Sequence, residues 1–201
     1  MLNDWSGIDQ PLAVNFIQQC RSWDGAFALM PGQEGHGGST FCAVGSLALM
    51  GKLDDVLDGY DDVSGGGRKE LVQWCVSRQI EGMQGRPNKL EDTCYSYWIG
   101  GTLKILNCDH LLDKCALKSF IMDCQTDMGG FNKLRNGLQC PDLLHSFYSL
   151  AWLSLEYNTV VDDGNKGGEK ILDVADTSLH PVDCILGVSD RRMKDFLLRK
   201  S

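Results

Sequence analysis

One apolar stretch decides the fold: Phe41-Cys42-Ala43-Val44-Gly45-Ser46-Leu47-Ala48-Leu49-Met50. Wound into a helix, it has almost no polar face, and such a helix belongs in the interior of a protein. Two later stretches have the same character: one begins at Ser96-Tyr97-Trp98 and runs to Leu106, and the other begins at Ser146-Phe147-Tyr148 and runs to Leu155. We therefore expect three inner helices.

Each apolar stretch follows an amphipathic segment that carries a marker cysteine. These cysteines, Cys20, Cys75 and Cys124, lie 55 and then 49 residues apart. Self-similarity at such a period is typical of helical repeats, and strand patterns are weak throughout the chain. The sequence therefore predicts an all-α protein of stacked helix pairs, with repeats at about 10–51, 68–107 and 114–155 and a C-terminal tail at 156–201.

Composition excludes several classes of protein. The chain has 201 residues, enough for one domain, and a formal net charge of -8, which argues against a nucleic-acid binder. No apolar run is long enough for a membrane span. Several of the nine cysteines sit within apolar runs, as expected of reduced thiols in a cytoplasmic protein.

Three helix pairs form only part of a ring. Because the inner helices at an open end would expose apolar surface, we expect this chain to belong to a longer one or to be capped by a partner. Residues 52–68 and 156–176 are rich in acidic residues or glycine, which favours solvated surface insertions. A short helix is expected at 190–199.

Aligning the repeats brings chemically active side chains to one end of the inner helices. His36 falls level with Asp92, and Cys94 falls close to the level of His145. A carboxylate, a thiolate and an imidazole make a three-ligand set for Zn²⁺ with a fourth position open, as in catalytic sites. The alternative is a buried cysteine beside a helix-capping aspartate, and the residues alone leave both readings open.

Hydrogen-bond donors gather at the same end of the inner helices: His36, Arg86, Lys89 and Tyr95. Together with helix N-termini they suit an anion such as a diphosphate, although a solvated basic loop is an equal alternative. Aromatic residues, among them Phe41 and Trp98, occupy inner-helix positions. They are either plain core residues or the wall of a hollow that holds a long apolar ligand with a charged head.

Three ordered motifs carry a resemblance to a known family. They are Gly35-His36-Gly37-Gly38-Ser39-Thr40-Phe41-Cys42; Gly85-Arg86-Pro87-Asn88-Lys89 followed by Asp92-Thr93-Cys94-Tyr95-Ser96-Tyr97-Trp98; and Gly129-Gly130-Phe131 with Pro141-Asp142 and His145. Over roughly residues 5–155 the chain resembles the β subunits of protein prenyltransferases. Asp92-Thr93-Cys94 and the opening Asp4-Trp5-Ser6-Gly7 are most similar to the geranylgeranyltransferase type I members.

The resemblance implies an α-α toroid of about six helix pairs, here an incomplete ring, bound by an α subunit in a heterodimer. It implies that Asp92, Cys94 and His145 hold one catalytic Zn²⁺, which binds and activates the cysteine thiol of a C-terminal CaaX motif. It also implies that the diphosphate of a geranylgeranyl donor contacts four residues: His36, Arg86, Lys89 and Tyr95.

Three further roles follow from the same resemblance. Trp98 and Phe41 would contact the lipid. Lys133 would replace the Mg²⁺ that farnesyltransferase uses, so that Mg²⁺ is not required. The acceptors would be small GTPase-type proteins that end in a CaaX motif, with leucine as the implied last residue.

Two other functions stay open. Family β subunits are nearly twice as long as this chain, so it could be a non-catalytic helical-repeat piece that only binds the α subunit. A farnesyl or Rab-type member of the family is the other alternative.

Overall fold

The computed structural model describes residues 5–59, 66–135, 140–162 and 182–189. Within these ranges the chain is helical, and its few β-bridges are isolated, as predicted. The elements in order are α1 (Gln10–Gln19), α2 (Gly37–Leu49), α3 (Leu53–Leu57), α4 (Gly66–Val76), α5 (Thr93–Ile105), the 3₁₀ helix η1 (Asp109–Leu111), α6 (Lys114–Asp123) and α7 (Leu143–Asp162).

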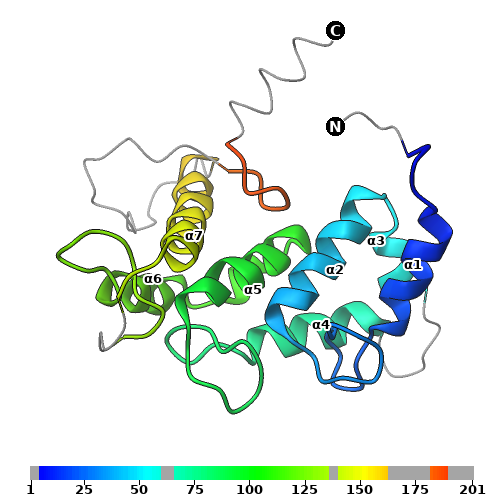
Figure 1. Ribbon diagram of the computed structural model, residues 1–201, viewed down its shortest axis with the longest axis horizontal. Coiled ribbons are helices and arrows are strands. Elements are labelled where there is room, and N and C mark those ends of the chain that lie inside the picture. Colours follow the sequence, from blue (N-terminus) through cyan, green and yellow to red (C-terminus); the bar gives the residue numbers. More distant parts are fainter. Residues whose placement is uncertain (1–4, 60–65, 136–139, 163–181, 190–201) are drawn as a thin grey trace, which may run out of the picture.

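The apolar helices α2, α5 and α7 form an inner layer, in which α5 packs against both of the others (Figure 1). Tyr97, Ile99 and Leu103 of α5 are almost completely buried, because α5 has a helix neighbour on either side. The amphipathic helices α1, α4 and α6 flank this layer, and each precedes one inner helix in the chain. The prediction of paired inner and outer helices is therefore confirmed.

Aspartate caps determine where two of the outer helices begin. The Asp9 carboxylate accepts the amide of Leu12 (2.9 Å) at the start of α1, and Pro11 adds a backbone angle already suited to a helix. At the start of α6, the Asp113 carboxylate accepts the amide of Ala116 (2.9 Å). These local signals do not depend on packing, so the sequence specifies them directly.

A tight loop follows each outer helix and is closed by one isolated bridge. The bridged pairs are Arg21 with Phe27, Gln79 with Met83 and Gln125 with Phe131. In the first and third loops a glycine has positive φ, +95° at Gly25 and +80° at Gly130, where other residues would be strained. All three loops lead into the N-termini of inner helices, which places those ends on one side of the molecule (Figure 1).

The expected solvated insertion at 52–68 is partly wrong. Residues 53–57 form α3, which packs against α2 and α4 and buries Val56 and Leu57 completely or nearly so. The acidic residues lie on the other face, where Asp58 pairs with Arg68 (2.8 Å). Burial of two apolar side chains thus turns an acidic stretch into part of the core.

The C-terminal tail is described only in part. The insertion expected at 156–176 is wrong at its start, since α7 continues to Asp162, and the helix expected at 190–199 lies outside the described residues. Residues 182–189 form a turn closed by a bridge between Val182 and Ser189. This turn packs on the inner layer, because the Tyr97 hydroxyl donates to the Cys184 carbonyl (3.2 Å).

Two further expectations concern the cysteines and membrane-spanning helices. All nine cysteines are free thiols, so none of them forms a disulfide. Among the described residues, no helix combines the length and the apolar character needed to cross a membrane.

Candidate metal and anion sites

Asp92 occupies the N-cap of α5. Its backbone is extended, and its side-chain Oδ1 accepts the amide of Cys94 at 3.0 Å. This Asx-type cap brings the carboxylate and the thiol to the same end of one helix. Both residues are buried, with Asp92 only 4% exposed.

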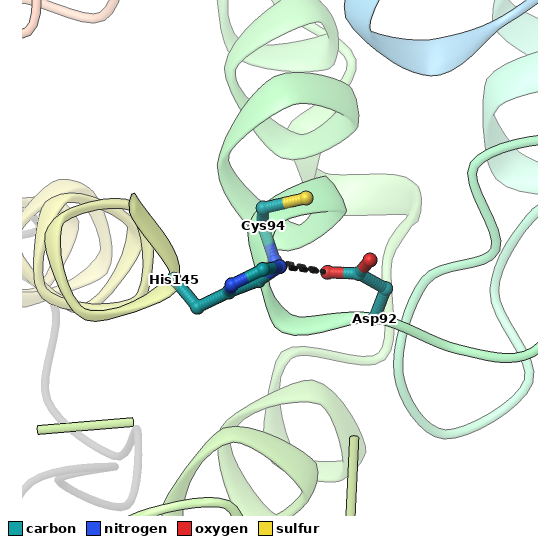
Figure 2. A group of neighbouring side chains, drawn as sticks. All are labelled: Asp92, Cys94 and His145. Atoms are coloured by element: carbon teal, nitrogen blue, oxygen red, sulfur yellow. Dashed lines mark hydrogen bonds and ion pairs between the residues drawn. The ribbon is translucent and has the colours of Figure 1, made fainter. Parts of the chain in front are cut away.

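His145 reaches the same point from the first turn of α7. Its amide donates to Oδ1 of Asp142 (2.9 Å), and its ring Nδ1 lies 2.6 Å from Oδ2 of the same carboxylate. Because a carboxylate only accepts, Nδ1 carries a proton, and Nε2 is the ring nitrogen left to present a lone pair to a cation bound beside Asp92. Figure 2 shows the ring directed toward Asp92, where Nε2 lies 3.3 Å from Oδ1.

Asp92, Cys94 and His145, called the metal group below, fit a divalent cation. Their ligand atoms all lie within 4.8 Å of one another. Burial and the adjacent Asp92 carboxylate raise the pKa of the Cys94 thiol far above its ordinary value. A cation bound between the three would reverse this effect, and one sulfur, one nitrogen and one oxygen donor suit zinc.

Lys133 lies at the edge of the metal group. Its Nζ is 3.5 Å from Oδ2 of Asp92, and its side chain is about half exposed. A hydrogen bond fixes the backbone of Lys133, because the Thr93 amide donates to the Lys133 carbonyl (3.0 Å). The loop before α7 thus adds one positive charge beside the buried carboxylate.

His36 and Tyr95 form a second site next to the metal group. The His36 ring caps α2, since its Nδ1 accepts the amide of Gly38 (3.1 Å), and its Nε2 lies 3.0 Å from the Tyr95 hydroxyl. With Nδ1 accepting, the neutral ring carries its proton on Nε2 and donates it to Tyr95. The Tyr95 hydroxyl can therefore direct its own proton toward a ligand.

The charges around this pair favour the neutral forms. Burial lowers the pKa of His36, the neighbouring Arg86 lowers it further, and Glu34 opposes the shift. Burial, together with Cys94 and Asp92, raises the pKa of Tyr95 to about 12. Both side chains can thus act as uncharged hydrogen-bond donors at neutral pH.

Arg86 projects from the turn that precedes α5. This turn approaches α2 closely, because the Gly37 amide donates to the Gly85 carbonyl (2.8 Å) and a Cβ on Gly85 would lie 2.1 Å from the Tyr95 ring. His36, Arg86 and Tyr95 are called the anion group below. Lys89 is exposed on the same turn, where its amide donates to the Arg86 carbonyl (3.4 Å) and its carbonyl accepts the Gln84 side-chain amide (2.6 Å).

A cavity of about 1200 Å³ opens beside the anion group. His36, Arg86, Phe41 and Trp98 line it, and apolar side chains of α1 and α2 contribute to the rest of its wall. The Trp98 ring packs edge-on against Tyr148 at 4.9 Å between centroids. The two predicted aromatic residues thus border a hollow as well as the core.

Two residues at these sites, Asp142 and Glu34, were not among the functional candidates from the sequence. Asp142 stands at the same repeat position as His36 and Asp92, and that register was the signal that could have revealed it. Glu34 forms an ion pair with Arg86 across 52 residues of chain. No local pattern indicates that pair, because it depends on how two loops meet.

The fold and the site together define the class of protein. The family model "Prenyltransferase alpha-alpha toroid domain" matches residues 1–188, so the chain belongs to the prenyltransferase α-α toroid family. The predicted fold class is therefore confirmed.

Among its relatives are the geranylgeranyl transferase type-1 β subunits of Arabidopsis thaliana and Dictyostelium discoideum. The chain is 48% identical to the first over 77% of its own length and 42% of that protein. It is 41% identical to the second over 77% of its length and 41% of that protein. The chain thus spans less than half the length of these relatives, and its resemblance to their family is confirmed.

A solved structure, titled "Candida albicans protein geranylgeranyltransferase-I complexed with GGPP", has a similar fold. The TM-score is 0.75 at 27% identity, over 94% of this chain and 50% of the other.

Proposed function

We propose that this chain contributes the metal-binding and diphosphate-binding part of a protein geranylgeranyltransferase type I β subunit. The reaction would transfer a geranylgeranyl group from its diphosphate to the cysteine of a C-terminal CaaX motif, with leucine as the last residue. One observation carries the proposal: the metal group and the anion group lie at the same end of adjacent inner helices, linked by the successive residues Cys94 and Tyr95.

Asp92, Cys94 and His145 would hold one zinc ion. A bound zinc would lower the pKa of the acceptor cysteine and supply a thiolate at neutral pH. The chain itself prepares the ligands: Asp142 directs the lone pair of His145 Nε2 inward, and the amide of Cys94 holds the Asp92 carboxylate in place. These hydrogen bonds support the assignment because they orient the ligands before any metal arrives.

The anion group would bind the diphosphate of the lipid donor. Tyr95 offers a hydroxyl proton, Arg86 a guanidinium and the N-terminus of α2 its partial positive charge. As the thiolate attacks C1, the bond to the leaving pyrophosphate breaks and negative charge grows on its oxygens. Donors already in position stabilise that charge without reorganising, and Lys89 on the same turn would add a further one.

The cavity beside the anion group would take the lipid. At about 1200 Å³ it exceeds the usual size of a small-molecule pocket, and its walls include Phe41 and Trp98. A long hydrocarbon chain with an anionic head matches a largely apolar hollow whose wall includes the donors His36 and Arg86.

Two observations favour the type I member of the family. Identity is 48% over 158 residues to the type-1 β subunit of Arabidopsis thaliana, against 36% over 127 residues to its type-2 β subunit 1 and 41% over 116 residues to the type-2 β subunit of Candida albicans. Lys133 also places a positive charge 3.5 Å from Asp92, where it can serve the leaving group in place of Mg²⁺.

An α subunit is the proposed partner. Large apolar side chains are exposed on the loops that lead into the inner helices, on the side of the proposed sites. Trp23 is 91% exposed in the first loop, Leu90 lies at the end of the second, and Met128 lies in the third. Exposed apolar side chains of this size are typical of surfaces that bind another protein.

The test is prenyl transfer by this chain co-purified with an α subunit. A peptide that ends in Cys-aliphatic-aliphatic-Leu would be offered with geranylgeranyl or farnesyl diphosphate. We expect transfer of the C20 lipid, loss of transfer and of bound zinc in Cys94→Ala, and no loss in Cys115→Ala, an exposed cysteine on α6.

The other outcomes distinguish the alternatives. Preferred transfer of the C15 lipid would indicate a farnesyl-type member. Stable binding of the α subunit without any transfer would favour a non-catalytic helical-repeat piece, which the length of 42% of the Arabidopsis relative makes the second candidate.

A further inference from the structure

Glu34 is an acidic residue inside a site built for an anion. Its carboxylate forms an ion pair with Nη1 of Arg86, and both side chains line the cavity beside His36. Glu34 is 49% exposed and Arg86 40%, so neither is locked in the core. The guanidinium proposed to bind a diphosphate is thus already occupied by a carboxylate of the same chain.

The fold holds both partners at this meeting point. Glu34 is followed by Gly35, whose amide donates to the Asp24 carboxylate (3.3 Å) and which has no room for a Cβ against Asp24 and Ala26. Arg86 follows Gly85, which is pressed against the Tyr95 ring. Close packing at the two glycines thus places Glu34 and Arg86 side by side, while their side chains stay half-exposed.

The charge of Glu34 also affects His36, a second member of the anion group besides Arg86. It opposes the effect of Arg86 on the neighbouring His36 imidazole, so both charges act on the same ring. A diphosphate brought to Arg86 would therefore meet a like charge beside it. The Glu34 carboxylate and a diphosphate on the same guanidinium would repel each other, and Arg86 cannot make its best hydrogen bonds with both at once.

We propose that Glu34 is the resident counter-anion of the diphosphate site. It holds Arg86 when the site is empty, gives Arg86 up when a diphosphate binds, and takes it back as pyrophosphate leaves. Glu34 therefore weakens anion binding and eases release of the leaving group. This inference rests on the proposed function, because it takes Arg86 to be a diphosphate ligand.

The experiment measures binding of inorganic pyrophosphate by calorimetry to this chain in complex with its α subunit. Glu34→Gln keeps the size of the side chain and removes its charge. We expect it to bind pyrophosphate about tenfold more tightly than the unmodified chain, in line with the cost of like charges at a binding site. We also expect faster dissociation of pyrophosphate from the unmodified chain than from Glu34→Gln.

Glu81→Gln is the matched control. Glu81 forms an equivalent ion pair with Arg135, between the loop before α5 and the loop before α7, and it does not line the cavity. Its neutralisation removes the same charge from the protein without touching the anion group. Affinity for pyrophosphate should therefore stay within twofold of the unmodified chain.

Arg86→Ala distinguishes failure of the diphosphate site from failure of the counter-anion role of Glu34. If Arg86→Ala weakens pyrophosphate binding while Glu34→Gln leaves it unchanged or weakens it, the counter-anion role is overturned and the diphosphate site stands. If the unmodified chain binds pyrophosphate no better than Arg86→Ala does, the diphosphate site fails, and the role of Glu34 with it. If Glu34→Gln and Glu81→Gln raised the affinity for pyrophosphate equally, the effect would come from the net charge of the protein. That result would also overturn the proposal.

Discussion

The metal group and the anion group are both built around capping positions of the repeat, but they differ in burial and charge. His36, Asp92 and Asp142 stand at equivalent positions and each accepts an amide at the start of an inner helix, α2, α5 or α7. Around Asp92 the site is buried and acidic, whereas around His36 it is half-exposed and lined by donors. A capping position thus supplies a side chain in a fixed place, and its neighbours decide the chemistry.

The largest expected effect separates capping from metal binding at Asp92. Asp92→Asn keeps an oxygen that can accept the Cys94 amide but removes the charge that a zinc ion needs. We expect loss of bound zinc and a fall in prenyl transfer of about a thousandfold, or ~4 kcal/mol. Elemental analysis and the transfer assay would measure both, and Asp92→Ala should in addition cost about 1 kcal/mol of helix stability.

Asp113→Ala is the control for this pair of variants. Asp113 caps α6 in the same way and has no part in the metal group. It should lose about 1 kcal/mol of unfolding free energy in urea titrations and keep its zinc. Zinc retained at full stoichiometry in Asp92→Asn would show that the metal group does not bind the ion.

A smaller effect is expected at Asp142, which contacts His145 without belonging to the metal group. Asp142→Asn leaves an oxygen for the His145 amide and removes the charged partner of Nδ1. Because second partners of ligating histidines set ring orientation and basicity, zinc affinity should fall about 10- to 100-fold. Competition with a chromophoric chelator would measure this, and an unchanged affinity would contradict the orienting role.

The smallest effect is a pH dependence specific to the anion group. The pKa of His36 is lowered from 6.5 in the folded protein, so the folded state binds fewer protons there than the unfolded state. This contribution to stability is present above pH 6.5 and is lost as the pH falls, since a protonated Nδ1 cannot accept the Gly38 amide. His36→Asn keeps a capping oxygen that does not titrate.

Urea unfolding of both proteins from pH 7.5 to pH 5 would measure this difference, with the other histidines common to both. The unmodified chain should lose more stability over that interval than His36→Asn does. If the free energy of unfolding changed with pH in the same way for both proteins, a depressed pKa at His36 would be contradicted.

Part of the candidate metal site was accessible from the sequence, for a definable reason. The repeat places Asp92, Cys94 and His145 at one height on neighbouring inner helices, and the structure brings their ligand atoms within 4.8 Å. This register can be read from the chain because each unit repeats the same order of features, although the marker cysteines lie 55 and then 49 residues apart. The same register would also have indicated Asp142, had the capping positions of all three repeats been compared.

Other features depend on how distant segments pack. The acidic and glycine-rich stretch at 52–68 predicted a solvated insertion, yet two apolar side chains turn one face of α3 into the core. The 182–189 turn meets Tyr97, 87 residues away from Cys184 in the chain, through a hydrogen bond from the Tyr97 hydroxyl to the Cys184 carbonyl. Lys133 reaches Asp92 because the loop before α7 lies against the start of α5.

The sequence by itself determined the helix pairs, their inner and outer layers, the caps that start them and the type of ligand offered at each inner-helix start. Those features follow from apolar periodicity and from side-chain-to-backbone hydrogen bonds over a few residues. Only the tertiary structure decided which loops touch, and so placed Glu34 on Arg86 and gave the anion group a counter-charge of its own. Contacts between loops 52 residues apart are set by packing of the whole arc, which no local pattern encodes.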